Sequence, residues 1–196
     1  PEEQEYIRRA VPKRFHEFRT VRALAREGLA ELGRARPSMV PGERGEPTWP
    51  AGIVGSITHC DGYRAIVVAE RAQIRGVGID AEPNRPLPSG VYRRISSALE
   101  RDAVRRMEEV VPQVCGDRLL FSAKESIYKV WFPMAGTMLQ FDQACVQFLP
   151  DGSFHAVLLV LPRRTDAIPH RLDGRWDLSE GVLRTIVALA PPAVRA

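Results

Sequence analysis

Residues 121–132 read Phe-Ser-Ala-Lys-Glu-Ser-Ile-Tyr-Lys-Val-Trp-Phe, and this stretch does most to decide how the chain folds. The spacing of its apolar residues predicts a helix over 116–132, on which Glu125 and Lys129 are i,i+4 neighbours. Lys124 lies about 100° round the same helix. Only three of the 28 basic residues are lysines, and two of these stand here. A surface ion pair is the plain alternative, but it does not explain why lysine recurs in this segment.

A predicted strand precedes this helix in the sequence and ends on two carboxylates. Residues 76–83 read Gly-Val-Gly-Ile-Asp-Ala-Glu-Pro, and strand alternation places Asp80 and Glu82 on one side of the backbone. Neighbouring carboxylates repel each other unless a cation neutralises them, and such oxygen ligands suit Mg²⁺. On this motif alone, an exposed acidic turn is the favoured alternative. The segment also matches the G-x-G-x-x-A dinucleotide fingerprint, but the prolines within 83–88 exclude the helix which that fingerprint requires.

The remaining segments predict an α+β protein in which a helix followed by strands occurs twice. Residues 13–32 have apolar residues at helical spacing, and a further helix is expected near 97–109. The expected strands are Ile53–Thr58, Ala65–Ala69, Gly76–Asp80, Gln143–Leu149, Phe154–Leu161 and Leu183–Leu189. Three prolines make residues 82–90 the best linker. We therefore expect two similar α/β halves, an N-terminal one over 1–84 and a C-terminal one over 85–196.

Several basic side chains are candidates for binding an anion. His59 stands at the end of an expected strand, where it either satisfies local hydrogen bonds as a neutral side chain or contacts a phosphate. Arg14, Arg22 and Arg44 are either solvated surface charges or guanidinium forks for a phosphate-bearing ligand. No G-x-S-x-G, G-x-x-x-x-G-K-S/T or H-E-x-x-H motif occurs in the chain.

Composition limits the class of protein. The chain has 196 residues, 44% of them hydrophobic and 27% charged, which suits a globular protein with a sizeable core. No apolar run approaches the ~18 residues of a membrane span, and no signal peptide is visible. Three cysteines without a C-x-x-C pair argue against a disulfide framework and a cysteine zinc site. We expect a cytoplasmic protein whose net charge of +4 favours an anionic partner, such as a phosphate, an acidic protein or a nucleic acid.

Three sequence blocks, taken in order, resemble the 4′-phosphopantetheinyl transferases of the single-chain, two-half type similar to the enterobactin synthetase D component. The blocks are residues 55–60 (Gly-Ser-Ile-Thr-His-Cys), 78–83 (Gly-Ile-Asp-Ala-Glu-Pro) and 121–132. Residues 13–22 and 45–50 also look like the N-terminal helix and loop of this family. Each block alone is weak evidence, whereas the three together are specific.

This resemblance implies transfer of 4′-phosphopantetheine from coenzyme A to a serine of an apo acyl or peptidyl carrier protein, with release of 3′,5′-ADP. It also implies one compact monomer, with pseudo-twofold halves that enclose a coenzyme cleft. Mg²⁺, or Mn²⁺, which carboxylate ligands do not distinguish from it, would be held by Asp80, the Ala81 carbonyl, Glu82 and Glu125. The coenzyme would be held by Arg14, Arg22, Arg44, Gly45, Glu46, Pro47, Thr58, His59, Asp80, Lys124 and Lys129.

Glu125 and Lys129 are the catalytic residues in this interpretation. Glu125 is the candidate base for the carrier serine, directly or through water, and Lys129 neutralises or protonates the leaving phosphate. A non-catalytic module that binds coenzyme A or a carrier protein is the alternative, and it would not need these carboxylates together with Lys129. A nucleic-acid-binding protein would show clustered cations with interleaved aromatics, whereas acidic residues lie between the cations here. We therefore expect no nucleic-acid and no membrane partner.

Overall fold

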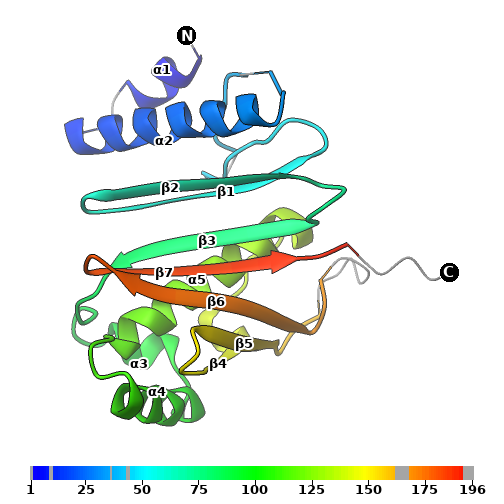
Figure 1. Cartoon of the computed structure of the whole chain (residues 1–196). Helices are drawn as coiled ribbons and strands as arrows, with labels where there is room; N and C mark the ends of the chain where they lie inside the picture. Colours follow the sequence, from blue (N-terminus) through cyan, green and yellow to red (C-terminus); the bar gives the residue numbers. More distant parts are fainter. Residues whose placement is uncertain (1, 9–10, 36, 43–44, 162–167, 192–196) are drawn as a thin grey trace, which may run out of the picture.

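Helices and strands follow one another much as the sequence predicts, in a mixed α+β fold (Figure 1). The computed structural model describes residues 2–8, 11–35, 37–42, 45–161 and 168–191. Its elements are α1 (Glu2–Ile7), α2 (Pro12–Glu31), β1 (Ile53–Cys60), β2 (Tyr63–Glu70), β3 (Gly76–Pro83), α3 (Val91–Ile95), α4 (Ala98–Val110), α5 (Gly116–Ala135), η1 (Phe141–Gln143), β4 (Ala144–Phe148), β5 (Ser153–Leu158), β6 (Arg171–Ser179) and β7 (Val182–Leu189). Each predicted helix and strand is present. No helix in these ranges combines the length and the apolar character that a membrane span needs.

The two halves are less alike than the sequence predicts. Strands β1 and β2 form a two-stranded sheet, whereas the other five strands form an antiparallel sheet in the order β3-β7-β6-β5-β4. Strand β6 is missing from the predicted elements because its few apolar residues, such as Leu172 and Trp176, alternate with charged ones. That alternation is itself the signal of a half-buried strand. Helices α1 and α3 are also missing from the prediction, since both are too short to show a helical period.

Strand β3 lies where the two sheets meet (Figure 1). Its backbone pairs with β7, so hydrogen bonding attaches it to the five-stranded sheet. On the side of β1, two hydroxyl groups bridge the strands. Ser56 Oγ accepts the Ile79 N–H at 3.1 Å, and Thr58 Oγ1 accepts the Ala81 N–H at 2.9 Å. The predicted boundary after residue 84 assigns β3 to the N-terminal half, whereas the backbone of β3 is hydrogen-bonded to β7 in the C-terminal half.

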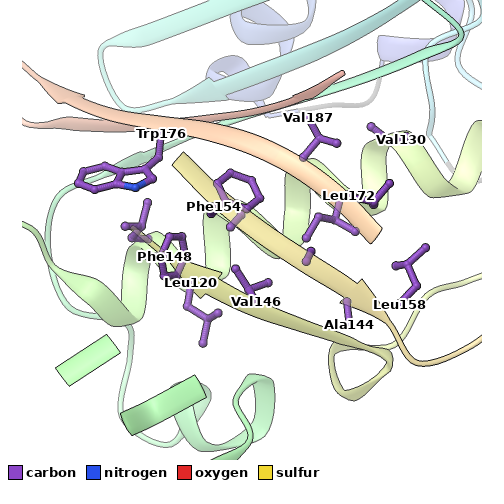
Figure 2. Packing of buried hydrophobic residues seen from close by; sticks show 14 of the residues in the cluster. Leu120, Val130, Ala144, Val146, Phe148, Phe154, Leu158, Leu172, Trp176 and Val187 are labelled. Carbon is purple, nitrogen blue, oxygen red and sulfur yellow. The ribbon is translucent and has the colours of Figure 1, made fainter. Parts of the chain in front are cut away.

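Three hydrophobic clusters among the described residues hold the layers together, and the smallest, formed by Val54, Ala69 and Val77, joins β1 and β2 to β3. Helix α2 covers one face of the β1–β2 hairpin, where Leu29 is fully buried. Helix α5 covers one face of the five-stranded sheet, and side chains of the helix and the strands pack in the space between them (Figure 2). This larger core includes Leu120, Val130, Phe154, Leu172 and Val187. The position of α5 is thus fixed by apolar burial along much of its length.

Two glycines of β3 allow α5 to approach the strand closely. A Cβ atom at Gly76 would lie 2.7 Å from Met134 Sδ, and one at Gly78 would lie 2.0 Å from the Ser126 carbonyl oxygen. The strand continues to Pro83 without opening a helix. These glycines therefore serve helix–sheet packing, and the dinucleotide fingerprint is excluded, as the sequence predicts.

We expect Gly78→Ala to lower the melting temperature by roughly 10 °C, because overpacking against a backbone carbonyl costs about 3 kcal/mol or more. Gly76→Ala is the matched comparison and should cost less, since the atom it meets belongs to the flexible Met134 side chain and not to the backbone. Thermal denaturation followed by circular dichroism measures both. A Gly78→Ala protein as stable as wild type would contradict the close approach of α5 to β3.

Candidate active site

A cavity of about 600 Å³ is lined by residues of α2, β1, β3 and α5, and it brings together blocks that are far apart in the sequence. The predicted site residues that line it are Arg14, Arg22, Gly45, Glu46, Pro47, Thr58, His59, Asp80, Glu125 and Lys129. Ala81, Glu82 and Lys124 are not among its lining residues, and Arg44 lies outside the described residues. Most of the site predicted from the sequence therefore meets at one cavity.

Asp80 is the buried acid of this cavity, with 6% of its surface exposed. Strand alternation gives it the same face of β3 as Gly78, the face that α5 covers. Its Oδ1 accepts hydrogen bonds from Lys129 Nζ at 2.8 Å and from the Thr58 hydroxyl at 3.4 Å. Its Oδ2 is buried and has no hydrogen-bond partner among the described residues. An unpartnered buried carboxylate oxygen is unfavourable, so this atom is suited to a bound cation or a donor.

Glu125 and Glu82 lie near Asp80, and their environments differ. Burial raises the pKa of Glu125 above its usual value, Asp80 raises it further, and Lys129 opposes both effects. Burial, followed by Asp80, also raises the pKa of Glu82. Glu82 Oε2, however, accepts a hydrogen bond from Arg118 Nη1 at 2.8 Å. Carboxylates that repel one another in this way ionise more readily when a cation lies between them.

These residues fit a hard cation in part. No three His, Cys, Asp or Glu side chains lie close enough together to form a ready-made metal site in the described ranges. Asp80 Oδ2 and the Glu125 carboxylate suit Mg²⁺, which commonly takes one or two carboxylates and completes its shell with water and phosphate oxygens. Ala81 could offer only its backbone carbonyl, because its methyl side chain has no ligand atom. Glu82 would first have to leave Arg118.

Arg22 is the buried cationic residue of the cavity, with 4% of its surface exposed. Its guanidinium carbon lies 4.7 Å from the centre of the Phe18 ring. Desolvation lowers the pKa of Arg22, and Glu3 opposes that effect. Its Nε is buried without a hydrogen-bond partner in the part of the chain that the structure describes. Such a guanidinium is suited to a charged acceptor such as a phosphate oxygen.

His59 stands at the rim of the cavity beside an acid that the sequence analysis does not single out. Its Nδ1 lies 3.8 Å from Glu17 Oε2, and Arg64 Nη2 lies 4.0 Å from Glu17 Oε1. Burial lowers the pKa of His59 and Glu17 opposes this, so the imidazole is mainly neutral at pH 7. Helical spacing places Glu17 on the same face of α2 as Arg14 and Val21, and this spacing could have identified Glu17 from the sequence.

Aromatic side chains complete the cavity wall. They are Tyr6, Phe18, Trp49, Tyr128 and Phe132. The rings of Tyr128 and Phe132 stack with their centres 5.7 Å apart. From the sequence, the aromatics of α5 are expected only to anchor the helix, because spacing alone does not show which face is hollow. Apolar walls with a few polar groups are typical of a small-molecule site.

Lys124 is not among the residues that line this cavity, in contrast to its predicted contact with the coenzyme. Its Nζ donates to the Ile95 and Phe141 carbonyl oxygens at 2.7 and 2.6 Å, and lies 2.8 Å from Glu100 Oε1. An ammonium group has three hydrogens, and each has a protein oxygen here. The prediction that Lys124 binds the coenzyme pyrophosphate is therefore not supported, because no donor is left for a ligand.

Comparison with known proteins identifies the family of this chain. Residues 2–69 match the 4′-phosphopantetheinyl transferase N-terminal domain, and residues 76–178 match the 4′-phosphopantetheinyl transferase superfamily. The chain is 48% identical to the 4′-phosphopantetheinyl transferase Svp of Streptomyces mobaraensis, over 98% of this chain and 79% of Svp. It is 43% identical to PptT of Mycobacterium tuberculosis (96% and 85%) and 42% identical to Npt of Nocardia iowensis (97% and 89%), both also 4′-phosphopantetheinyl transferases. The chain therefore belongs to the 4′-phosphopantetheinyl transferase superfamily and is an enzyme that transfers 4′-phosphopantetheine to carrier proteins.

Proposed function

We propose that the cavity binds coenzyme A between the two halves of the chain, with the 3′-phosphate of the ribose near Arg22 and His59 and the pyrophosphate near Lys129. The observation that carries this proposal is a pair of unpartnered buried atoms, Arg22 Nε and Asp80 Oδ2, on residues that line one cavity. The first atom needs an acceptor, and the second needs a cation or a donor. A nucleotide with several phosphates and an associated metal ion supplies both.

Asp80 and Glu125 are the proposed ligands of Mg²⁺, and Mn²⁺ would satisfy the same carboxylates. Glu82 is a further candidate ligand, but it would first have to leave Arg118. Ala81 is a candidate only through its backbone carbonyl. When bound, the ion polarises the attacked phosphate and offsets charge on the leaving group.

Glu125 is the proposed base. Its carboxylate lines the cavity, and in the metal-free protein burial and then Asp80 raise its pKa. It takes the proton from the carrier serine while the serine Oγ forms a bond to the phosphorus that bears pantetheine. The bond from this phosphorus to the oxygen of 3′,5′-ADP breaks, and Lys129 donates a proton or a hydrogen bond to that oxygen.

A single chain is proposed to be sufficient for this reaction. Arg22, Asp80 and Glu125 all line one cavity within one copy, so no residue from a second copy is needed. The net charge of +4 favours encounter with an acidic protein, as a carrier domain is expected to be. We accordingly expect a monomer that acts on apo acyl or peptidyl carrier proteins in the cytoplasm, where both substrates are made.

We expect Arg22→Gln to raise the KM for coenzyme A by roughly 10- to 100-fold, because a charge-assisted hydrogen bond to the 3′-phosphate is lost. The KM for 3′-dephospho-coenzyme A should change little, since that substrate lacks the group in question. Steady-state kinetics with both substrates, at a fixed carrier concentration, measure the difference.

Arg19→Gln is the matched control for this prediction. Arg19 is an exposed residue of the same helix and does not line the cavity, so both KM values should stay at the wild-type level. If Arg22→Gln raises the KM for both substrates equally, the 3′-phosphate does not bind at Arg22.

A further inference from the structure

A buried ion pair between Lys124 and Glu100 lies outside the proposed reaction. Nζ and Oε1 are 2.8 Å apart, and each side chain is 2% exposed. From the middle of α5, Lys124 also donates to the Ile95 carbonyl at the end of α3 and to the Phe141 carbonyl in η1. Lys124 thereby ties the helix that carries Glu125 to two other segments.

Glu100 extends this network to two more elements. Its Oε1 accepts the Val146 N–H of β4 at 3.0 Å, and its Oε2 accepts the Ser97 N–H at 2.8 Å. The second bond closes the capping box at the start of α4. Strand β4 is an edge strand, so the first bond also satisfies an N–H that an edge leaves open. We call Lys124 and Glu100 with their four backbone partners the ionic clamp.

Stability alone is a weak reason for such a clamp. Removing two charges from water is costly, and apolar side chains of similar volume are often as stabilising as a buried ion pair. What distinguishes the clamp is its place, because Lys124 directly precedes Glu125. Elsewhere on α5, Ser122 Oγ lies 3.0 Å from Thr185 Oγ1 of β7. Polar contacts on two faces of the helix set its rotation about its own axis, and hence the direction in which Glu125 points.

We infer that Lys124 and Glu100 are positioning residues that hold α5 so that Glu125 faces the cavity, and that Lys124 does not bind coenzyme A. The inference rests on the proposed role of Glu125. A displacement of about 1 Å in a reacting group can lower turnover about 100-fold. Coenzyme affinity should change less than kcat, because the proposed 3′-phosphate contacts at Arg22 and His59 lie on α2 and β1, and only the pyrophosphate contact at Lys129 moves with α5.

A double-mutant cycle tests this inference. Lys124→Met leaves Glu100 buried with no cation, so we expect the melting temperature to fall by roughly 10 °C or more. Glu100→Gln combined with Lys124→Met removes both charges and keeps an acceptor for the capping box, and it should recover most of that loss. Assayed well below its melting temperature, the double variant should show a kcat at least about 10-fold lower, and its calorimetric Kd for coenzyme A should rise by a clearly smaller factor.

Two results would overturn the inference. One is a folded double variant with wild-type kcat, which would make the clamp purely structural. The other is a Kd for coenzyme A that weakens by as large a factor as kcat falls, which would make Lys124 a coenzyme ligand.

Two further proteins complete the experiment. Glu125→Gln, assayed in parallel, separates the two hypotheses: an active Glu125→Gln enzyme would reject the proposed base itself, not only the clamp. Asp102→Asn combined with Arg105→Met removes an exposed ion pair from α4, and it should leave the melting temperature and kcat unchanged.

Discussion

The Glu125→Gln variant is expected to fold normally and to modify carrier proteins at least about a thousandfold more slowly than wild type. Glutamine has nearly the same size as glutamate, but it neither accepts the serine proton nor offers a charged ligand to a cation. Because Glu125 is proposed for both tasks, its replacement should affect kcat far more than the affinity for coenzyme A. Single-turnover assays at saturating coenzyme A, read by intact mass of the carrier protein, measure the effect.

The stability of this variant gives an independent readout. Burial and Asp80 raise the pKa of Glu125 above its unfolded value, so the stability of the metal-free protein falls as the pH rises from the unfolded pKa through the folded one. Glutamine does not ionise. We therefore expect Glu125→Gln, at pH 8 in a chelator, to melt no lower than wild type. Added Mg²⁺ should raise the melting temperature of wild type more than that of the variant.

The control for these measurements is Glu109→Gln, which changes an exposed acid on α4 and should behave as wild type. Turnover near the wild-type rate in Glu125→Gln would reject Glu125 as base and as metal ligand. A lower melting temperature in the chelator would reject the electrostatic account of the acidic cluster.

Lys129→Met is expected to reduce kcat by roughly 100- to 1,000-fold. Lys129 Nζ donates to the Ile79 carbonyl at 2.9 Å and to Asp80 Oδ1 at 2.8 Å. An ammonium group has three hydrogens, so one remains for the departing phosphate. The same side chain thus fixes one oxygen of Asp80 and supplies a donor to the reaction. Its removal also leaves the buried Asp80 carboxylate without its cation.

Lys129→Arg separates charge from geometry at this position. A guanidinium keeps the positive charge, but its planar fork does not reproduce the three donor directions of an ammonium group. We expect a loss in kcat of at least about 10-fold, measured with Lys129→Met under identical conditions. If the Lys129→Arg variant has the wild-type kcat, Lys129 contributes charge alone and does not direct a proton to a particular oxygen.

The meeting of Asp80, Glu125 and Lys129 at one cavity was predictable because the rules that orient these side chains are local. Helical spacing sets Glu125 and Lys129 on one face of α5, and strand alternation sets Asp80 and Glu82 on one face of β3. The small residue at Gly78 lets that face of the strand meet α5. The packing of α5 against β3 then brings these groups together.

The sequence was less informative where a side chain's partner lies far away in the chain. Helical periodicity places Lys124 next to Glu125, but its true direction depends on Glu100, which belongs to another helix. In the same way, Arg118 holds Glu82 from the first turn of α5, although nothing around either residue in the sequence pairs them. The difference between the two sheets also depends on β6, which has few apolar residues but shows the alternation of a half-buried strand.

The most direct test of the account is the intact mass of an apo carrier protein incubated with this enzyme, coenzyme A and Mg²⁺, beside a chelator control and the Asp80→Asn variant. The account predicts a gain of one phosphopantetheine with wild type and Mg²⁺, and none in the chelator or with the variant. Modification that persists in the chelator, or that proceeds normally in Asp80→Asn, would contradict the proposed cation site between Asp80 and Glu125.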